Sequence, residues 1–242
     1  MEPAASWDDL AGWWRTTFAN GADIEYELQI LPLCCEELEG CAKVLDIGTG
    51  EGQLARRLAG RAGKGALVVG VDPYAAQLGS AAEQGGGVSY LRAAGESLPF
   101  RDGAFDGVVC CLVVEHADDG DLLLAEAARV VSPKGRFVLL VNHPLTQGPQ
   151  SGLIDDTITG ERYWRIGPYL SEVATVEEVD PGVKVRFSHR PLSRYVNTLC
   201  EKGLVLSRLE EPAPPRGFLV DSIDIELEAA TPRLCLMVFE RR

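Results

Sequence analysis

The sequence predicts an α/β fold in which helices cover a largely parallel sheet. Residues 43–59, KVLDIGTGEGQLARRLA, combine a short apolar run, a glycine-rich turn and a segment rich in Leu, Ala and Arg. This is the pattern of a buried strand, a tight turn and a helix. A second apolar run follows at residues 66–71, and further runs at 88–91, 105–113 and 137–141 alternate with segments of helical pattern. Such alternation is typical of parallel sheets covered by helices.

The first of these units predicts a site for a nucleoside cofactor. Its glycines let the backbone approach a ligand, which would meet amide groups at a helix start. Asp72 ends the second apolar run, where a carboxylate can accept hydrogen bonds from both hydroxyls of a ribose. Asp46 stands two residues before Gly48 and would repel a phosphate and attract an ammonium or sulfonium. A dinucleotide fingerprint also needs a glycine where this chain has Gln53.

These residues resemble the first motif and the ribose-binding acid of class I S-adenosylmethionine-dependent methyltransferases. Residues 92–116, RAAGESLPFRDGAFDGVVCCLVVEH, resemble two further motifs of that family, and residues 131–144, VSPKGRFVLLVNHP, resemble its turn and fifth strand. Residues 189–212, HRPLS…EP, are similar to small-molecule members of the methyltransferase type 11 group. The resemblance implies a Rossmann-like class I methyltransferase fold: a seven-stranded, mostly parallel sheet with helices on both faces and an antiparallel last strand at residues 233–240.

The resemblance also implies S-adenosyl-L-methionine as the cofactor and a set of residues that bind it. The residues that match are Asp46, Gly48, Thr49, Gly50 and Gly52 for the methionine end, Asp72 and Pro73 for the ribose, Gly95, Glu96 and Ser97 for the adenine, and Cys111 and Leu112 at the end of the fourth strand. The family usually places an acid before LPF to contact the adenine amino group, but this chain has Ala94 there. That contact would have to come from Glu96, from water or from nothing.

The predicted activity is methyl transfer to a small molecule, with O-methylation by a histidine base as the first hypothesis. The chain has three histidines: His143 follows the fifth strand, His116 belongs to the Glu115–His116 pair, and His189 precedes the last predicted helix. A histidine that titrates near neutrality can take a proton from a hydroxyl, and we rank His143 first. His143 could instead cap its strand, and the family's usual role for the Glu-His pair is structural. An amine or activated carbon acceptor would need a base less.

Four segments are expected within one domain of residues 1–242. They are an N-terminal helical cap (1–40), a cofactor-binding core (41–141), an inserted substrate cover rich in aromatic residues (142–190), and a C-terminal core helix with strands (191–242). In the cap, Trp7, Trp13, Trp14 and Phe18 lie at roughly helical spacing. We interpret them as an amphipathic helix that packs on the core, in preference to a lid over the cofactor. Pro32 should kink or break the helix that follows.

Composition and net charge indicate which partners the protein can bind and in which compartment it is expected. A net charge of -13 is repelled by nucleic acid and by anionic membrane surfaces, which favours a small-molecule substrate. No apolar run reaches the roughly 18 residues that span a bilayer, and acids stand near the N-terminus, so we expect a cytoplasmic protein. The seven cysteines include no C-x-x-C pair, which argues against a metal site and against a disulfide framework. The sequence does not determine the oligomeric state.

Two alternatives from other classes remain. A nicotinamide-dependent oxidoreductase is disfavoured by Gln53, by Asp46 and by the LPF motif. A non-catalytic binding protein with the same fold is favoured by Ala94. The chain has CLVVEH at residues 111–116, where enzymes that methylate a nucleobase amino group carry an Asp/Asn-Pro-Pro-aromatic box, so that activity is disfavoured.

Overall fold

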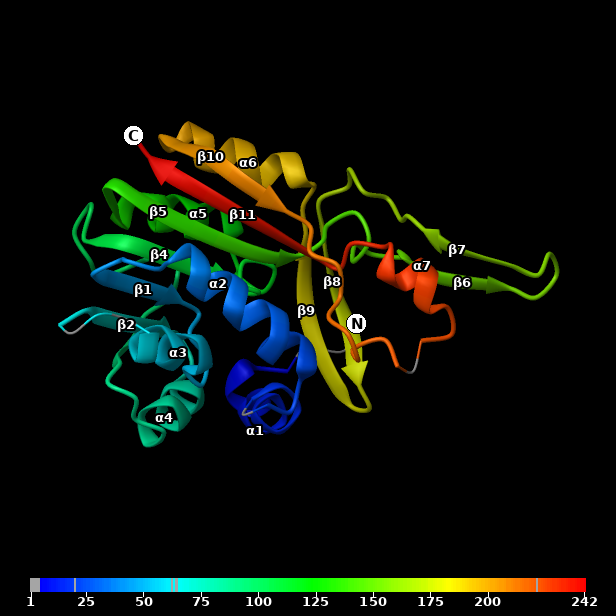
Figure 1. Cartoon of the computed structure of the whole chain (residues 1–242), viewed down its shortest axis with the longest axis horizontal. Coiled ribbons are helices and arrows are strands. Elements are labelled where there is room, and N and C mark those ends of the chain that lie inside the picture. The colour runs from blue at the N-terminus through cyan, green and yellow to red at the C-terminus, as the bar shows by residue number, and fades with distance from the viewer. Residues whose placement is uncertain (1–4, 20, 62, 64, 221) are drawn as a thin grey trace.

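The computed structural model describes residues 5–19, 21–61, 63, 65–220 and 222–242, and it is built around one twisted sheet of seven strands (Figure 1). The strand order is β10-β11-β5-β4-β1-β2-β3. The strands are β1 (Lys43–Ile47), β2 (Leu67–Asp72), β3 (Ser89–Arg92), β4 (Phe105–Cys111), β5 (Val131–Asn142), β10 (Leu204–Glu210) and β11 (Leu234–Arg241).

Strand direction follows the prediction. Strands β1 to β5 are mutually parallel, and β11 pairs antiparallel with both β5 and β10. Because parallel strands share one carboxyl edge, the residues that follow β1, β2 and β4 come together at the same edge of the sheet. The predicted α/β fold, with seven strands and a mostly parallel sheet, is confirmed.

Two apolar layers hold the helices against the sheet. Neighbouring residues of β1 face opposite layers, as side chains do in any strand: Val44 packs with α2 (Leu31–Glu37) and α3 (Gln53–Arg61), and Leu45 packs with α5 (Gly120–Val130) and α6 (Leu192–Glu201). The central strands are buried on both faces and are therefore almost continuously apolar. A further helix, α4 (Ala75–Glu83), connects β2 with β3.

The N-terminal segment forms two helical units beside this core. Helix α1 (Trp7–Phe18) begins at Ser6, whose hydroxyl accepts a hydrogen bond from the amide of Asp8. A π-helical turn, η1 (Tyr26–Ile30), leads directly into α2. Pro32 is expected to kink or break this helix, but it lies in the first turn of α2, where the missing N–H of proline costs little, and no break occurs there. Residues 1–4 and 20 of the predicted cap lie outside the described residues.

The segment between β5 and α6 is regular, although its turn residues suggested the least regular part of the chain. It forms two antiparallel hairpins, β6 (Gly152–Asp156) with β7 (Glu161–Arg165), and β8 (Val173–Asp180) with β9 (Val183–His189). The β6–β7 hairpin extends away from the sheet beside the short helix α7 (Ile225–Ala229), and β9 runs past the carboxyl edge of the sheet (Figure 1). Within the described residues, none of the helices has the length and apolar character needed to cross a membrane.

Candidate functional site

The glycine-rich turn after β1 has the backbone that its sequence predicts. Gly48 has a φ of 71°, and a Cβ added there would lie 2.4 Å from Cγ2 of Val113. Gly50 also has a positive φ, of 55°. These values suit glycine, and the close approach of Val113 excludes any side chain at Gly48. The turn therefore passes tightly under the loop that follows β4.

Two carboxylates lie beside this turn. The hydroxyl of Thr49 donates to Oδ2 of Asp46 at 2.7 Å. The amide of Gly50 donates to Oδ2 of Asp72 at 3.0 Å, and the amide of Tyr74 donates to its Oδ1 at 2.9 Å. The second strand is thereby fixed to the glycine turn, with each carboxylate oxygen of Asp72 keeping a second lone pair.

Burial makes both carboxylates reluctant to ionise. Desolvation raises the pKa of Asp46 from 3.8 to about 7, with the charge of Asp72 adding to the shift and the Thr49 hydrogen bond opposing it. Desolvation also raises the pKa of Asp72 to about 6, against the two backbone hydrogen bonds that lower it. Acids in this condition are stabilised by a cationic or hydroxyl-bearing ligand, and they cluster at functional sites.

One pocket unites most of the residues that the sequence singled out. It lies at the carboxyl edge of β1, β2 and β4. The predicted cofactor residues that line it are Asp46, Gly48, Thr49, Gly50, Asp72, Pro73, Gly95, Glu96, Cys111 and Leu112. Gly52 and Ser97 are not part of its wall. A Cβ at Gly52 would lie 2.2 Å from the hydroxyl of Tyr90, so this glycine serves the packing of the turn.

At the adenine end of the predicted site, the backbone at Gly95 packs closely against α5. A Cβ at Gly95 would lie 2.8 Å from a methyl of Leu123, so the chain passes close to α5. Oε1 of Glu96 accepts hydrogen bonds from the amides of Asp118 and Asp119, at 3.1 and 3.4 Å. That oxygen is therefore engaged in holding the start of α5 and is not free to contact an adenine amino group.

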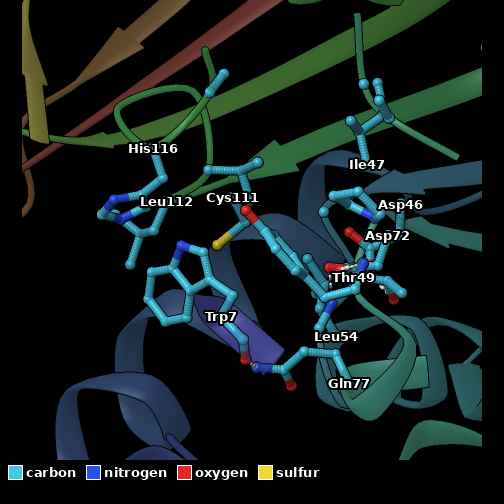
Figure 2. A pocket seen from close by; sticks show the side chains of 18 of the residues that line it. Trp7, Asp46, Ile47, Thr49, Leu54, Asp72, Gln77, Cys111, Leu112 and His116 are labelled. Carbon is cyan, nitrogen blue, oxygen red and sulfur yellow. Dashed lines mark hydrogen bonds between the residues drawn. The ribbon is translucent and has the colours of Figure 1, made fainter. Parts of the chain in front are cut away.

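The same pocket has an aromatic surface. Trp7 and Trp14 of α1 and Tyr26 of η1 all line the pocket, which fits the second interpretation of α1, a lid over the cofactor, better than the preferred one, packing on the core. Figure 2 shows Trp7 beside Leu112, Cys111 and His116, across the pocket from Asp46, Asp72 and Thr49. Helical spacing of tryptophans identifies an apolar face and cannot say what that face covers.

The three histidines do not come together. His116 lines the pocket, and its Nδ1 donates to the carbonyl of Arg186 at 2.9 Å, which leaves the lone pair on Nε2 of the neutral ring. His143 is buried away from the pocket wall, with Nε2 at 2.6 Å from a carboxylate oxygen of Glu211. His189 is also buried, and its Nε2 donates to the carbonyl of Tyr169 at 2.7 Å. The positions of His143 and His189 do not support a role as base, and the ranking of His143 first is not supported.

The two inserted hairpins, β6–β7 and β8–β9, contribute no residue to the lining of the pocket. Strand β9 contacts the loop after β4: the amide of Ser188 donates to the carbonyl of Glu115 at 2.7 Å, and the ring of Phe187 packs on His116 with centroids 4.8 Å apart. The predicted role of residues 142–190 as a substrate cover stays a prediction. They contact His116 and its loop, and also α1, where Nε1 of Trp13 donates to Asp180 at 2.9 Å.

Several polar atoms of the pocket residues have no hydrogen-bond partner although they are buried. They are Oε1 of Glu51, Oε1 of Gln53 and Oε1 of Gln77. Each is an acceptor, and an unsatisfied buried acceptor is costly unless a ligand completes it. Together with Asp46 and Asp72, they fit a ligand that brings hydroxyl and ammonium donors, which describes S-adenosylmethionine. No cluster of potential metal ligands occurs among the described residues, and all seven cysteines are unpaired thiols.

Comparison with known proteins agrees with this geometry. Residues 45–139 match the model of a methyltransferase domain family. An S-adenosylmethionine-dependent methyltransferase from Mesorhizobium loti is 26% identical and superimposes with a TM-score of 0.72, over 87% of this chain and 95% of that one. Residues 45–139 thus match a methyltransferase domain, and the chain has the fold of the class I methyltransferases. The predicted family and fold are thereby confirmed, as is S-adenosyl-L-methionine as the cofactor of that family.

Curated relatives match this methyltransferase domain over part of their length. A demethylmenaquinone methyltransferase from Thermus thermophilus is 38% identical over 132 residues, which cover 53% of this chain and 59% of the relative. A ubiquinone biosynthesis O-methyltransferase from Agrobacterium fabrum is 36% identical over 119 residues, which cover 47% and 46%. The chain thus spans roughly half the length of the curated relatives it matches.

Proposed function

We propose that this chain is an S-adenosylmethionine-dependent methyltransferase that acts on a small molecule. The observation that carries the proposal is the pocket itself, in which the buried acids Asp46 and Asp72 lie beside the tight glycine turn. When bound, the cofactor supplies a methyl group that is attached to a positively charged sulfonium. Once the methyl group is transferred, the sulfur is left as a neutral thioether. Little covalent help is needed from the protein, which has to position the acceptor and exclude water.

Each part of the pocket has a role in this proposal. Asp46 and Gly48 hold the methionine end, Asp72 accepts hydrogen bonds from the ribose hydroxyls, and the backbone at Gly95 faces the adenine. Because Oε1 of Glu96 is engaged with the start of α5, recognition of the adenine amino group by a side chain would fall to Oε2 of Glu96 or to Asp118, which both line the pocket. The division into a cap, a core, an insertion and a C-terminal part belongs to this proposal.

For the chemistry, O-methylation with a histidine base remains the first proposal, and His116 replaces His143 as the base. His116 is the histidine on the pocket wall, and the carbonyl of Arg186 fixes its tautomer so that Nε2 can accept the proton of an acceptor hydroxyl. The family's usual structural role for this histidine is the competing explanation. Methylation of carbon is the second candidate, since the relatives include a ubiquinone/menaquinone biosynthesis C-methyltransferase that is 32% identical over 142 residues. A cytoplasmic location stays a prediction.

Calorimetric titration with S-adenosylmethionine and S-adenosylhomocysteine tests the proposal. The unmodified chain should bind both in the micromolar range, which corresponds to about -8 kcal/mol. Asp72→Ala should abolish binding, because the ribose loses its acceptor. Asp155→Ala is the matched control, since Asp155 is on the β6–β7 hairpin and pairs with Arg162. If neither ligand binds to the folded chain, the proposal fails and the non-catalytic reading favoured by Ala94 takes its place.

A further inference from the structure

Four aromatic side chains form a continuous wall on one side of the pocket. Trp7 contacts the ring of His116, with centroids 5.1 Å apart, and Trp14 at 5.7 Å; Trp14 in turn contacts Tyr26 at 5.8 Å. We call Trp7, Trp14, Tyr26 and His116 the aromatic wall. All four line the pocket, although they come from α1, η1 and the loop after β4.

We propose that the aromatic wall binds the methyl acceptor and that this acceptor is an uncharged, planar aromatic molecule. The inference rests on the proposed function, because it takes the other side of the pocket as the place of the cofactor. Asp46, Thr49 and Asp72 lie on that other side, opposite Trp7 and His116 (Figure 2). The wall is therefore opposite the acids proposed for the methionine end and the ribose of the cofactor.

Unusual backbone is concentrated where the wall meets the sheet. Tyr26 begins the π-helical turn η1, and Leu112, beside Cys111 on the pocket, has a φ of 55°. A leucine in the left-handed region is strained, and π-helical turns occur frequently at functional sites. Strain of this kind persists where the surrounding structure holds a side chain or a loop in a required place. Here the strained residue is Leu112, which lines the pocket between the aromatic wall and the glycine turn.

The charges on the pocket exclude an anionic acceptor. The described residues that line it include no lysine or arginine. They include five acids: Asp46, Glu51, Asp72, Glu96 and Asp118. A carboxylate or phosphate on the acceptor would thus lie among like charges with no lysine or arginine to pair with, and the sulfonium of the cofactor is already balanced by the same acids.

Among the described residues, three arginines contact residues of the pocket; Arg92 does so through Nε, which donates to the carbonyl of Pro73 at 2.9 Å, and the other two pair with acids of the pocket. Nη2 of Arg56 pairs with Glu51 at 3.0 Å. Nη1 of Arg186 donates to the carbonyl of Ala117 at 3.1 Å and lies 3.7 Å from a carboxylate oxygen of Asp118. Neither of these two is free to neutralise an anion on the acceptor.

A cationic acceptor is excluded for a different reason. The sulfonium of the cofactor carries a positive charge, and a second cation held against the same acids at reacting distance would be repelled by it. Large aromatic side chains instead offer flat apolar area and prefer aromatic partners at ring separations like those within the wall. A neutral planar ring satisfies both conditions.

The test measures binding of three matched probes to the chain saturated with sinefungin, an unreactive cofactor analogue whose amine replaces the charged sulfonium centre. The probes are 2-naphthol, 6-hydroxy-2-naphthoate and 6-(aminomethyl)-2-naphthol, which share a ring and a hydroxyl and differ in charge. Calorimetry at neutral pH should show 2-naphthol bound at least about tenfold more tightly than either charged probe. Trp7→Leu should weaken 2-naphthol by about tenfold or more and leave sinefungin affinity unchanged.

Trp13→Leu is the matched control, because Trp13 lies on the same helix but off the pocket, with its Nε1 donating to Asp180 at 2.9 Å. It should preserve both affinities, and Trp14→Leu provides a second wall variant should Trp7→Leu not fold. The proposal is overturned if 2-naphthol does not bind, if a charged probe binds as tightly, or if folded wall variants bind it normally. Loss of sinefungin binding alone would instead count against the proposed function, and 2-naphthol titrated without sinefungin then decides the role of the wall.

Discussion

His116 and Arg186 are joined by a hydrogen bond across 70 residues of sequence, from Nδ1 of the imidazole to a backbone carbonyl of β9 at 2.9 Å. A carbonyl can only accept, so the proton of the neutral ring is on Nδ1 and the lone pair is on Nε2. The insertion therefore determines the tautomer of this histidine, although it contributes no residue to the pocket wall. Trp7 and Phe187 contact the same ring at 5.1 and 4.8 Å and hold its orientation.

Removing the proposed base should slow methyl transfer without weakening cofactor binding. We expect His116→Gln to lower kcat on a hydroxyl acceptor by about 10²-fold or more, the usual contribution of a general base. S-adenosylhomocysteine affinity, measured by calorimetry, should stay the same. His143→Gln is the control and should affect stability rather than kcat, because His143 is buried against Glu211. An equal loss of kcat in both variants would show that His116 has no special role.

The buried acid of the glycine turn should make folding stability depend on pH. The pKa of Asp46 rises from 3.8 when unfolded to about 7 when folded, so the folded state holds the proton more tightly. Its stabilising contribution is present below about pH 4 and is lost as the pH rises through about 7. Asp46→Asn should therefore raise the free energy of unfolding at pH 8, by up to a few kcal/mol, and by less at pH 5. Urea unfolding of the ligand-free chain at both pH values measures this difference.

The same acid should make cofactor affinity depend on pH in the opposite sense. S-adenosylmethionine carries a positive charge and binds best when Asp46 is ionised, so its affinity should rise between pH 6 and pH 8. Asp46→Asn should weaken binding and flatten that rise. Calorimetry across this range, in buffers of different ionisation enthalpy, also measures the proton released on binding. A variant that keeps the full pH dependence would assign it to another group, with Asp72 next in order.

The glycine turn should tolerate no side chain at Gly48. Gly48→Ala combines a left-handed backbone, which costs an L residue roughly 1 kcal/mol, with a Cβ placed 2.4 Å from Val113. We expect a clear fall in the urea midpoint and loss of cofactor binding. Gly48→Ala with Val113→Ala should recover part of the stability, because it removes the overlap but not the backbone strain. Gly12→Ala serves as control, since a Cβ there meets nothing within 4 Å.

Arg129 should support the loop that carries Gly95. Its guanidinium donates to the carbonyls of Leu98 and Phe100 and pairs with Glu126 and Asp102. Lysine cannot reproduce this planar set of hydrogen bonds. Arg129→Lys should lower the free energy of unfolding by about 1–2 kcal/mol and weaken S-adenosylhomocysteine binding. Arg162→Lys, on the exposed hairpin, should change neither.

The sequence alone determined the central sheet and most of the cofactor side of the pocket. Apolar runs in fixed order, glycines that need positive φ, and acids at strand ends are local signals, and Gly48, Asp46 and Asp72 follow directly from them. They could be predicted because a strand, a turn and a helix adjacent in sequence must also be adjacent in space. Of the predicted cofactor residues, only Gly52 and Ser97 do not line the pocket; they support the turn and the loop instead.

Tertiary structure decided the acceptor side. Trp7, Tyr26 and His116 meet on the pocket although they are separated along the chain, and their packing depends on how α1 and β9 dock against the sheet. The sequence shows that a histidine follows a strand, but not which way the strand's loop turns. From the sequence, His143 is therefore ranked above His116, although the fold buries it against Glu211, because burial and hydrogen-bond partners are properties of long-range packing and not of local pattern.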